Sequence, residues 1–301
     1  MKIKYWIKAA RLRTLPLALS CILMGGGLSL AIHNKIDWVV FILCLTTTLL
    51  LQVLSNFSND YGDGIKGADQ FRENADRMVQ QGLISKKSML IGIIICSILC
   101  FISGCLLLYK SIGCSQLIIV LGFLILGIIA ITAAIKYTVG KTAYGYQGLG
   151  DLFVFVFFGL VGVLGSFYLL SSTFDLITIF GSIFTGCMSA AVLNMNNMRD
   201  YESDLRVNKN TLVVKIGINK AKLYHTFLIV ISIFAYFIIS FQLNNKLILF
   251  GLIPCIILIS NLKKVFSFNN LQELDSELKK IALVCFFSSL WIILTHYTFS
   301  N

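Results

Sequence analysis

Apolar residues run along this chain in long, nearly unbroken stretches that are separated by shorter polar segments. A helix that crosses a bilayer needs roughly 20 mainly apolar residues. Nine such stretches lie at about 15–32, 38–56, 88–109, 115–135, 152–171, 176–194, 225–242, 246–262 and 281–299. The runs are continuous rather than alternating, which predicts membrane-spanning helices and argues against a barrel. The eighth run is the weakest, because its fully apolar part is short and contains Pro254.

Composition and charge agree with a multi-pass membrane protein. Of 301 residues 57% are hydrophobic, which excludes an ordinary soluble domain. The net charge of +11 is unevenly placed: of 25 Lys and Arg residues, 22 precede the first predicted helix or follow an even-numbered one. The positive-inside rule therefore predicts a cytoplasmic N-terminus and a non-cytoplasmic C-terminus. The basic excess reflects this topology and contact with anionic membrane lipid rather than binding to nucleic acid.

The few acidic residues gather after two of the predicted helices. Of 14 in the chain, five follow the second helix and three follow the sixth: Asp60, Asp63, Asp69, Glu73 and Asp76, then Asp200, Glu202 and Asp204. Asn196, Asp200 and Asp204 are four residues apart and would share one face of a helix, as would Asn59 and Asp63. Gly64 and Gly67 predict a break in the helix before Asp69.

The positions of the two acidic clusters suggest a duplicated architecture. They lie four helices apart, and four helices restore the same orientation in the membrane. The sequence therefore predicts a single all-α domain over 1–301, with two four-helix repeats and a ninth helix around a central cavity. Both clusters would face that cavity from the cytoplasmic side. The simpler alternative is that these acids are solvated and paired with nearby Lys and Arg.

Carboxylates in this setting suit a divalent cation and a phosphorylated substrate. Mg²⁺ commonly bridges one or two carboxylates and a substrate phosphate. Two facing clusters would hold a diphosphate through Mg²⁺, with Arg77 and Lys209 on the remaining phosphate oxygens. The neighbouring apolar helices suit a substrate with a long hydrocarbon tail. The rival interpretation is a cation-coupled transporter, which should carry ionisable groups near the midplane of its helices, where this chain has almost none.

Several stretches resemble one enzyme family. "NDYGDGIKGAD" (59–69) and "RDYESD" (199–204) are similar to the two motifs of the UbiA superfamily of intramembrane prenyltransferases. The spacing of Asp63 and Asp69, together with "KYTVGKTAYGYQGLGD" (136–151), most resembles the branch that acts on 1,4-dihydroxy-2-naphthoate in menaquinone biosynthesis. Relatives usually have proline where this chain has Leu12 and Ala143, a departure expected to affect local rigidity only.

The resemblance implies an enzyme of the bacterial inner membrane and a role for each motif residue. It would transfer a polyprenyl group from polyprenyl diphosphate to 1,4-dihydroxy-2-naphthoate, losing CO₂ and diphosphate and giving demethylmenaquinone. The implied Mg²⁺ ligands are Asp63, Asp69, Asp200 and Asp204, with Asn59 and Asn196 assisting. Lys136, Arg77 and Lys209 would lie near the diphosphate, with the acceptor carboxylate as the alternative partner of Arg77. Tyr137, Tyr144 and Tyr146 would stack on the ring or the cation.

Two questions stay open at the level of sequence. Another acceptor, such as 4-hydroxybenzoate or haem, remains an alternative to the naphthoate. The sequence implies no obligate protein partner, and it does not reveal the length of the prenyl chain.

Overall fold

The computed structural model describes residues 2–67, 77–140, 142–243, 245–268 and 270–299, and every regular element in these ranges is a helix. The first half contains α1 (Ile3–Ala10), η1 (Leu12–Thr14), α2 (Leu15–His33), α3 (Trp38–Lys66), α4 (Lys86–Ser111), α5 (Leu117–Lys136) and η2 (Tyr144–Gln147). The second half contains α6 (Gly150–Val154), η3 (Phe155–Leu164), α7 (Gly165–Ser171), α8 (Ile177–Arg199), α9 (Tyr201–Arg206), α10 (Leu212–Ile216), α11 (Ile218–Gln242), η4 (Lys246–Cys255), α12 (Ile256–Ser267), η5 (Leu271–Leu274) and α13 (Asp275–Phe299).

All nine predicted spans are confirmed. In the described residues nine continuous helical segments are long and apolar enough to cross a membrane. Several of them run beyond their apolar stretch. The second extends from Trp38 to Lys66 and the sixth from Ile177 to Arg199, so the polar residues that follow the apolar runs begin on helices rather than in loops.

The eighth span is irregular for an identifiable reason. Its first part, η4, is a 3₁₀ helix that contains Pro254, which has no backbone N–H to donate. Side chains of the ninth span help to satisfy its carbonyl groups: Trp291 Nε1 donates to the carbonyl of Leu247 at 2.8 Å, and Ser288 Oγ donates to that of Gly251 at 2.7 Å. Pairing of this kind is what a non-α segment needs at membrane depth.

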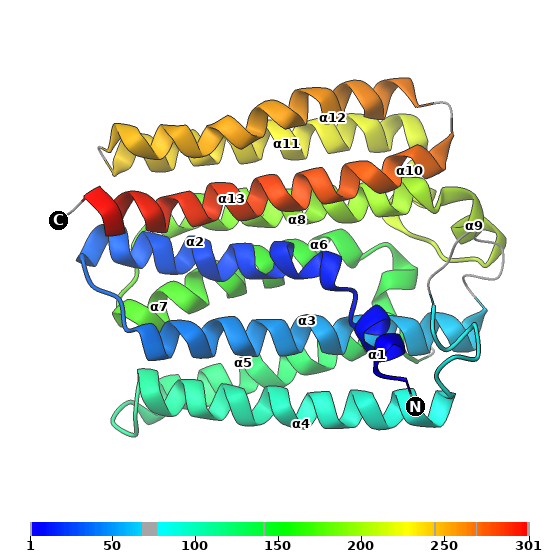
Figure 1. Ribbon diagram of the computed structural model, residues 1–301, viewed down its shortest axis with the longest axis horizontal. Helices are drawn as coiled ribbons and strands as arrows, with labels where there is room; N and C mark the ends of the chain where they lie inside the picture. The colour runs from blue at the N-terminus through cyan, green and yellow to red at the C-terminus, as the bar shows by residue number, and fades with distance from the viewer. Residues whose placement is uncertain (1, 68–76, 141, 244, 269, 300–301) are drawn as a thin grey trace.

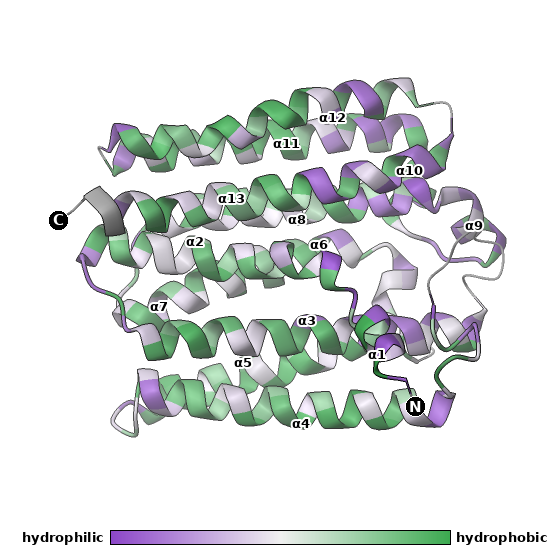
Figure 2. Cartoon of the chain, in the orientation of Figure 1, coloured by the Kyte–Doolittle hydropathy of each residue, from purple (hydrophilic) through white to green (hydrophobic). Residues whose placement is uncertain are grey.

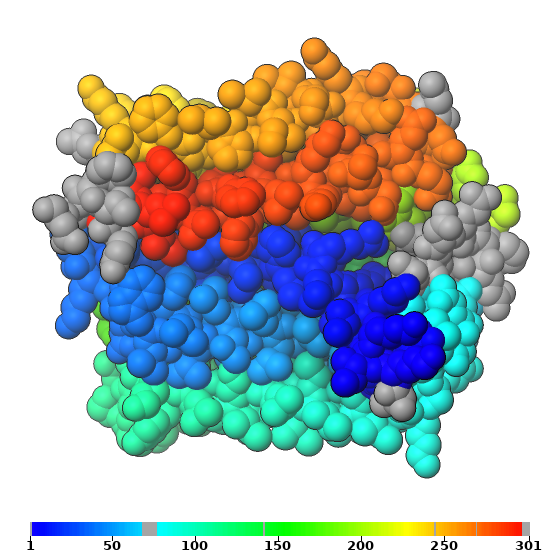
Figure 3. Space-filling view, in the orientation of Figure 1, coloured from blue at the N-terminus to red at the C-terminus, as the bar shows by residue number. Residues whose placement is uncertain are grey.

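The helices lie side by side along one direction (Figure 1). Helices α2, α8 and α13 pack against one another in the middle, with α11 and α12 on one side and α3, α4 and α5 on the other. The space-filling view shows the red C-terminal helix directly against the blue N-terminal helices (Figure 3). The beginning and the end of the chain thus share one core.

Polar residues concentrate at one end of the bundle. Figure 2 shows hydrophilic colours around α1, α9 and the adjoining end of α3, and mainly hydrophobic colours along the middle of the helices. Many large apolar side chains of α4 and α5 are exposed, among them Ile95, Ile118 and Ile128. An apolar outer surface between polar ends is what a lipid-embedded protein presents, so this is a multi-pass membrane protein.

Candidate active site

A cavity of about 420 Å³ lies between the first six spans. This volume falls within the range of small-molecule sites. Its apolar walls come from α2, α3, α4, α5, η3 and α7, and its polar end carries Asn56, Asn59, Asp63, Arg77, Asp200 and Lys209. Among the described residues, spans seven to nine contribute no lining residue, so they support the cavity from behind. The cavity therefore combines a polar end with mainly apolar walls.

The first acidic motif continues helix α3. Because α3 extends to Lys66, Asn59 and Asp63 lie one turn apart and both line the cavity. The helix ends at Gly67, which adopts a left-handed conformation with φ of 67° that costs glycine little. The predicted break is therefore confirmed. The predicted ligand Asp69 lies outside the described residues.

Asp63 is held between a cation and a phenol. Arg77 Nη2 lies 2.5 Å from its Oδ2, and the Tyr146 hydroxyl donates to its Oδ1 at 2.9 Å. Both Asp63 and Arg77 are buried. The ammonium of Lys66 lies 3.7 Å above the ring of Tyr146, which adds a second positive charge beside the carboxylate. A buried carboxylate requires such partners.

Asp60 fixes the segment that carries Arg77. Its two carboxylate oxygens accept hydrogen bonds from the backbone N–H groups of Met78 and Val79, both at 2.9 Å. Asp60 is completely buried. It therefore anchors the chain directly after Arg77 and is fully occupied by that task.

The segment after α5 brings aromatic rings over the polar end. It approaches α3 so closely that a Cβ on Gly62 would lie 2.7 Å from Thr138 Oγ1. Thr138 Oγ1 donates to the carbonyl of Ser58 at 2.9 Å. Tyr137 and Tyr144 both line the cavity, and their rings meet edge to face at 5.3 Å. Burial raises the pKa of both phenols, so both stay neutral.

Three of the predicted site residues do not line the cavity. Tyr146 and Asp204 stand behind it and contact lining residues, namely Asp63 and Lys209. Lys136 is the last residue of α5, and its side chain is exposed. The structure thus brings Tyr146 and Asp204 to the site through their partners but leaves Lys136 outside it.

The second acidic motif spans a break between two helices. Helix α8 ends at Arg199 and α9 begins at Tyr201, with Asp200 between them. Backbone hydrogen bonds still join Asp200 N to the Asn196 carbonyl at 3.1 Å and Asp204 N to the Asp200 carbonyl at 2.9 Å. The three predicted residues therefore keep their spacing of one turn despite the break.

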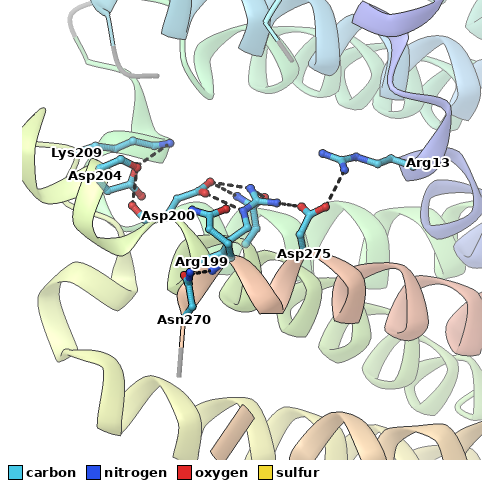
Figure 4. Close-up of polar contacts among 10 residues, drawn as sticks. Arg13, Arg199, Asp200, Asp204, Lys209, Asn270 and Asp275 are labelled. Carbon is cyan, nitrogen blue, oxygen red and sulfur yellow. Dashed lines mark hydrogen bonds and ion pairs between the residues drawn. The ribbon is translucent and has the colours of Figure 1, made fainter. Parts of the chain in front are cut away.

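Arg199 is a residue of this site that the sequence motifs did not single out. Its Nε and Nη2 donate to the two carboxylate oxygens of Asp200, each at 2.8 Å, and Nη2 also donates to Asn196 Oδ1 at 2.7 Å (Figure 4). Its Nη1 donates to Asp275 at the start of α13. The available signal was its place directly before Asp200 in "RDYESD".

Asp204 and Lys209 form a buried pair with 3.5 Å between Oδ1 and Nζ (Figure 4). Burial raises the pKa of Asp204 to about 7; Lys209 acts against this rise, and the carboxylates of Asp200 and Asp63 add to it. Burial alone would lower the pKa of Lys209, but Asp63, Asp204 and Asp200 together raise it. Lys209 is therefore a charged ammonium at the polar end of the cavity.

The donor set fits Mg²⁺ that is shared with a substrate. Asp204 Oδ2 is buried and has no hydrogen-bond partner among the described residues, as expected of an oxygen that awaits a cation. In the same residues no three His, Cys, Asp or Glu side chains are close enough to hold one ion. Oxygen donors divided between two segments suit Mg²⁺ bound by few carboxylates and by phosphate oxygens.

Comparison with known proteins places the chain in a family. Residues 18–295 match the UbiA prenyltransferase family. The 1,4-dihydroxy-2-naphthoate octaprenyltransferase of Haemophilus influenzae is 46% identical over 237 residues, which cover 78% of this chain and 76% of that protein. The enzyme of the same name from Escherichia coli is 43% identical over 229 residues, 76% of this chain and 73% of that protein.

A solved structure shares the fold. A UbiA homolog from Archaeoglobus fulgidus, bound to DMAPP and Mg²⁺, superposes with a TM-score of 0.57 at 15% identity. The superposition covers 94% of this chain and 98% of that one. The family match spans nearly the whole chain, the relatives exceed 40% identity, and the fold agrees. The chain is a member of the UbiA prenyltransferase family.

Proposed function

We propose that this prenyltransferase transfers a polyprenyl group from polyprenyl diphosphate to 1,4-dihydroxy-2-naphthoate, in a reaction that requires Mg²⁺. The observation that carries the proposal is the composition of the cavity. Asp63, Arg77, Asp200 and Lys209 lie at one end of a space whose other walls are mainly apolar. An amphiphilic diphosphate with a hydrocarbon tail matches both parts.

The charged residues of the polar end would bind the diphosphate. Arg77 and Lys209 carry positive charge into the cavity and can contact phosphate oxygens. We assign Asp63, Asp200, Asp204 and the predicted ligand Asp69 to holding Mg²⁺, with Asn59 and Asn196 beside them. When bound there, Mg²⁺ would supply positive charge that stabilises the diphosphate as it leaves.

The aromatic residues would receive the acceptor and shield the reacting carbon. Tyr144 and Phe153 stack with 4.0 Å between ring centroids, and both line the cavity with Tyr137. Such rings stabilise a nearby cation through their π faces. They also exclude water, which would otherwise capture the allylic cation.

The proposed reaction balances without a further reactant. The bond between the allylic carbon and the diphosphate oxygen breaks, and the diphosphate keeps the electron pair. The ring carbon that bears the carboxylate then forms a bond to the allylic carbon. The bond to the carboxylate breaks next, CO₂ leaves, and its electron pair restores the aromatic ring.

We propose that the polar end faces the cytoplasm of a bacterial cell, in its inner membrane. Cys114, in the link between α4 and α5, is exposed at the opposite end, whereas seven of the other cysteines are buried. A membrane-impermeant maleimide should therefore label Cys114 from the outside of intact cells. If Cys114 is labelled only after the cells are opened, the orientation of the protein is the opposite of the one proposed.

The decisive test is the choice of acceptor. Purified protein would receive an allylic prenyl diphosphate, Mg²⁺ and either 1,4-dihydroxy-2-naphthoate or 4-hydroxybenzoate, and the products would be identified by mass spectrometry. We expect a prenylated, decarboxylated naphthalenediol and an equal amount of CO₂. Prenylation of 4-hydroxybenzoate alone would assign a different acceptor, and the absence of any product would reject the proposed activity.

A further inference from the structure

We propose that Asp275 is a positioning residue for Asp200, acting through Arg199, and that it thereby sets the affinity of the site for its divalent cation. The inference rests on the proposed function, because it treats Asp200 as a metal ligand. Asp275 is the first residue of α13, in the ninth span, which contributes no described residue to the cavity wall.

The contacts form a continuous chain from α13 to Asp200 (Figure 4). Asp275 Oδ1 accepts a hydrogen bond from Arg199 Nη1. The Nε and Nη2 groups of the same guanidinium donate to both carboxylate oxygens of Asp200 at 2.8 Å. Because the guanidinium is planar and rigid, fixing one edge on Asp275 also fixes the edge that Asp200 meets.

The charges explain why a second carboxylate is needed. The side chain of Arg199 is only 2% exposed, so its charge must be balanced by neighbouring groups. Asp200 alone would balance it, but the pair would then be neutral and would attract a cation weakly. Asp275 adds a second negative charge beside the guanidinium, so the positive charge of Arg199 is shared between two carboxylates and neutralises Asp200 less completely.

Asp275 also reaches the other end of the chain. Its Oδ2 lies 3.4 Å from Arg13 Nη1, on η1 directly before the cavity-lining residue Thr14. The side chains of Arg13 and Asp275 are 57% and 46% exposed, so this outer pair contributes little energy by itself. The strong contact of Asp275 is therefore the one with buried Arg199.

The proposal predicts a specific effect on metal binding. In Asp275→Asn the charge on Asp275 is lost, so the edge of the Arg199 guanidinium that faces away from Asp200 loses its anionic partner. Loss of a group that orients a metal ligand typically weakens metal binding about 10-fold to 100-fold. Asp275→Glu keeps the charge, and its affinity should stay within a few-fold of the unsubstituted protein. Glu273→Gln is the matched control, because Glu273 pairs instead with Lys264 of α12.

The experiment measures metal binding directly. Full-length protein in detergent, with inorganic pyrophosphate present, would be titrated with Mn²⁺ while electron paramagnetic resonance reports the free ion. The Mn²⁺ bound by pyrophosphate alone, measured in the same detergent without protein, would be subtracted. We expect Asp275→Asn to raise the dissociation constant about 10-fold or more and Glu273→Gln to leave it unchanged. If Asp275→Asn does not insert or fold, Asp275→Ser replaces it, since this change also removes the charge.

The outcomes separate this inference from the proposed function. Equal Mn²⁺ affinity in the unsubstituted protein and in the variant that lacks the charge would overturn the role of Asp275 while leaving the metal site intact. No Mn²⁺ binding by the unsubstituted protein would overturn the metal site, and this inference with it. A purely structural role for Asp275 would lower thermal stability without moving the dissociation constant, which also counts against the proposal.

Discussion

Arg77 Nη2 lies 2.5 Å from Asp63 Oδ2, and both side chains are buried, although 14 residues of chain separate them. The contact joins a helical carboxylate to a cation in the segment that follows it. Each needs the other while the cavity holds no substrate, because an unpaired buried charge is costly. A bound diphosphate would compete for Arg77, and a bound cation would compete for Asp63. The ion pair therefore keeps Arg77 and Asp63 at the polar end of the cavity, where the diphosphate and the cation would bind.

Replacing Asp63 should stop the reaction and leave the protein in the membrane. Asp63→Asn keeps the volume but removes a charge from the proposed metal site. Loss of one electrostatic contact at a transition state typically lowers kcat about 100-fold to 1,000-fold. The measurement is the prenylation rate of purified protein.

The control for this substitution lies at the other end of the same helix. Asp37 caps α3 by accepting from Val39 N at 2.9 Å and Val40 N at 3.1 Å, and asparagine caps about equally well. Asp37→Asn should therefore retain its activity. Nearly normal turnover in Asp63→Asn would argue against a catalytic role for the acidic motif.

Adding Asp200→Asn to Asp63→Asn should lower the prenylation rate only a little further, because the effects of groups that act as a unit are not additive.

Removing divalent cations should abolish turnover. If the carboxylates of the two motifs act through Mg²⁺, excess EDTA should stop product formation, and added Mg²⁺ should restore it. The same titration on Asp63→Asn should require more Mg²⁺. Full activity in excess chelator would refute the metal requirement.

Removal of the Tyr146 hydroxyl should lower the activity, although Tyr146 does not line the cavity. It donates to Asp63 Oδ1 at 2.9 Å, and the ring lies under Lys66. Tyr146→Phe keeps the ring and loses a hydrogen bond to a charged group, worth about 1.5–3 kcal/mol. We expect kcat/KM to fall about tenfold or more on that basis. Tyr5→Phe, on α1, is the control, and an equal effect of both changes would exclude a specific role.

Gly62 should tolerate no side chain. A Cβ there would lie 2.7 Å from Thr138 Oγ1 and 2.9 Å from the Thr138 carbonyl carbon, so Gly62→Ala must push the aromatic segment away. Overpacking of this kind typically costs about 1–3 kcal/mol. Both the melting temperature and the activity should fall. Gly122→Ala, on α5 with nothing within 4 Å of a Cβ, should leave both unchanged or slightly improved.

Gly127 offers a test of the mainly apolar part of the cavity. It lines the cavity, yet a Cβ there would meet nothing within 4 Å. Gly127→Phe should therefore add a ring beside the cavity, because the first carbon of its side chain would meet no neighbour. We expect kcat/KM to fall more for a long prenyl diphosphate than for a short one. Gly122→Phe, on the same helix but outside the cavity lining, should change kcat/KM equally for the long and the short prenyl diphosphate.

Much of the fold could be predicted from the sequence. Apolar runs reveal spanning helices because the bilayer requires both length and hydrophobicity. The unequal numbers of Lys and Arg on the two sides of the predicted helices indicate how the chain is oriented in the membrane. The short apolar run and Pro254 also marked the eighth span as the weakest of the nine. The break of α3 at Gly67 followed from a conformation that glycine adopts at little cost.

Local chemistry also indicated most of the candidate site. Spacing of four residues placed Asn59 with Asp63 and Asn196 with Asp200, since that interval is close to one helical turn. Arg77 and Lys209 followed from the chemistry of the same two loops, and the resemblance to the UbiA superfamily added Lys136 and the tyrosines. The order of residues along the chain carried this information because each motif lies within a single element or directly after it.

Contacts between distant segments were decided only by the tertiary structure. Nothing in the sequence pairs Asp275 with Arg199 across 76 residues, or sets Thr138 against Gly62. Lys136 belongs to a motif that resembles the family, yet its side chain is exposed and does not line the cavity. Hydrophobicity and helical periodicity act within one segment and so can be seen in the sequence, whereas the partner of a buried charge depends on how separate helices pack.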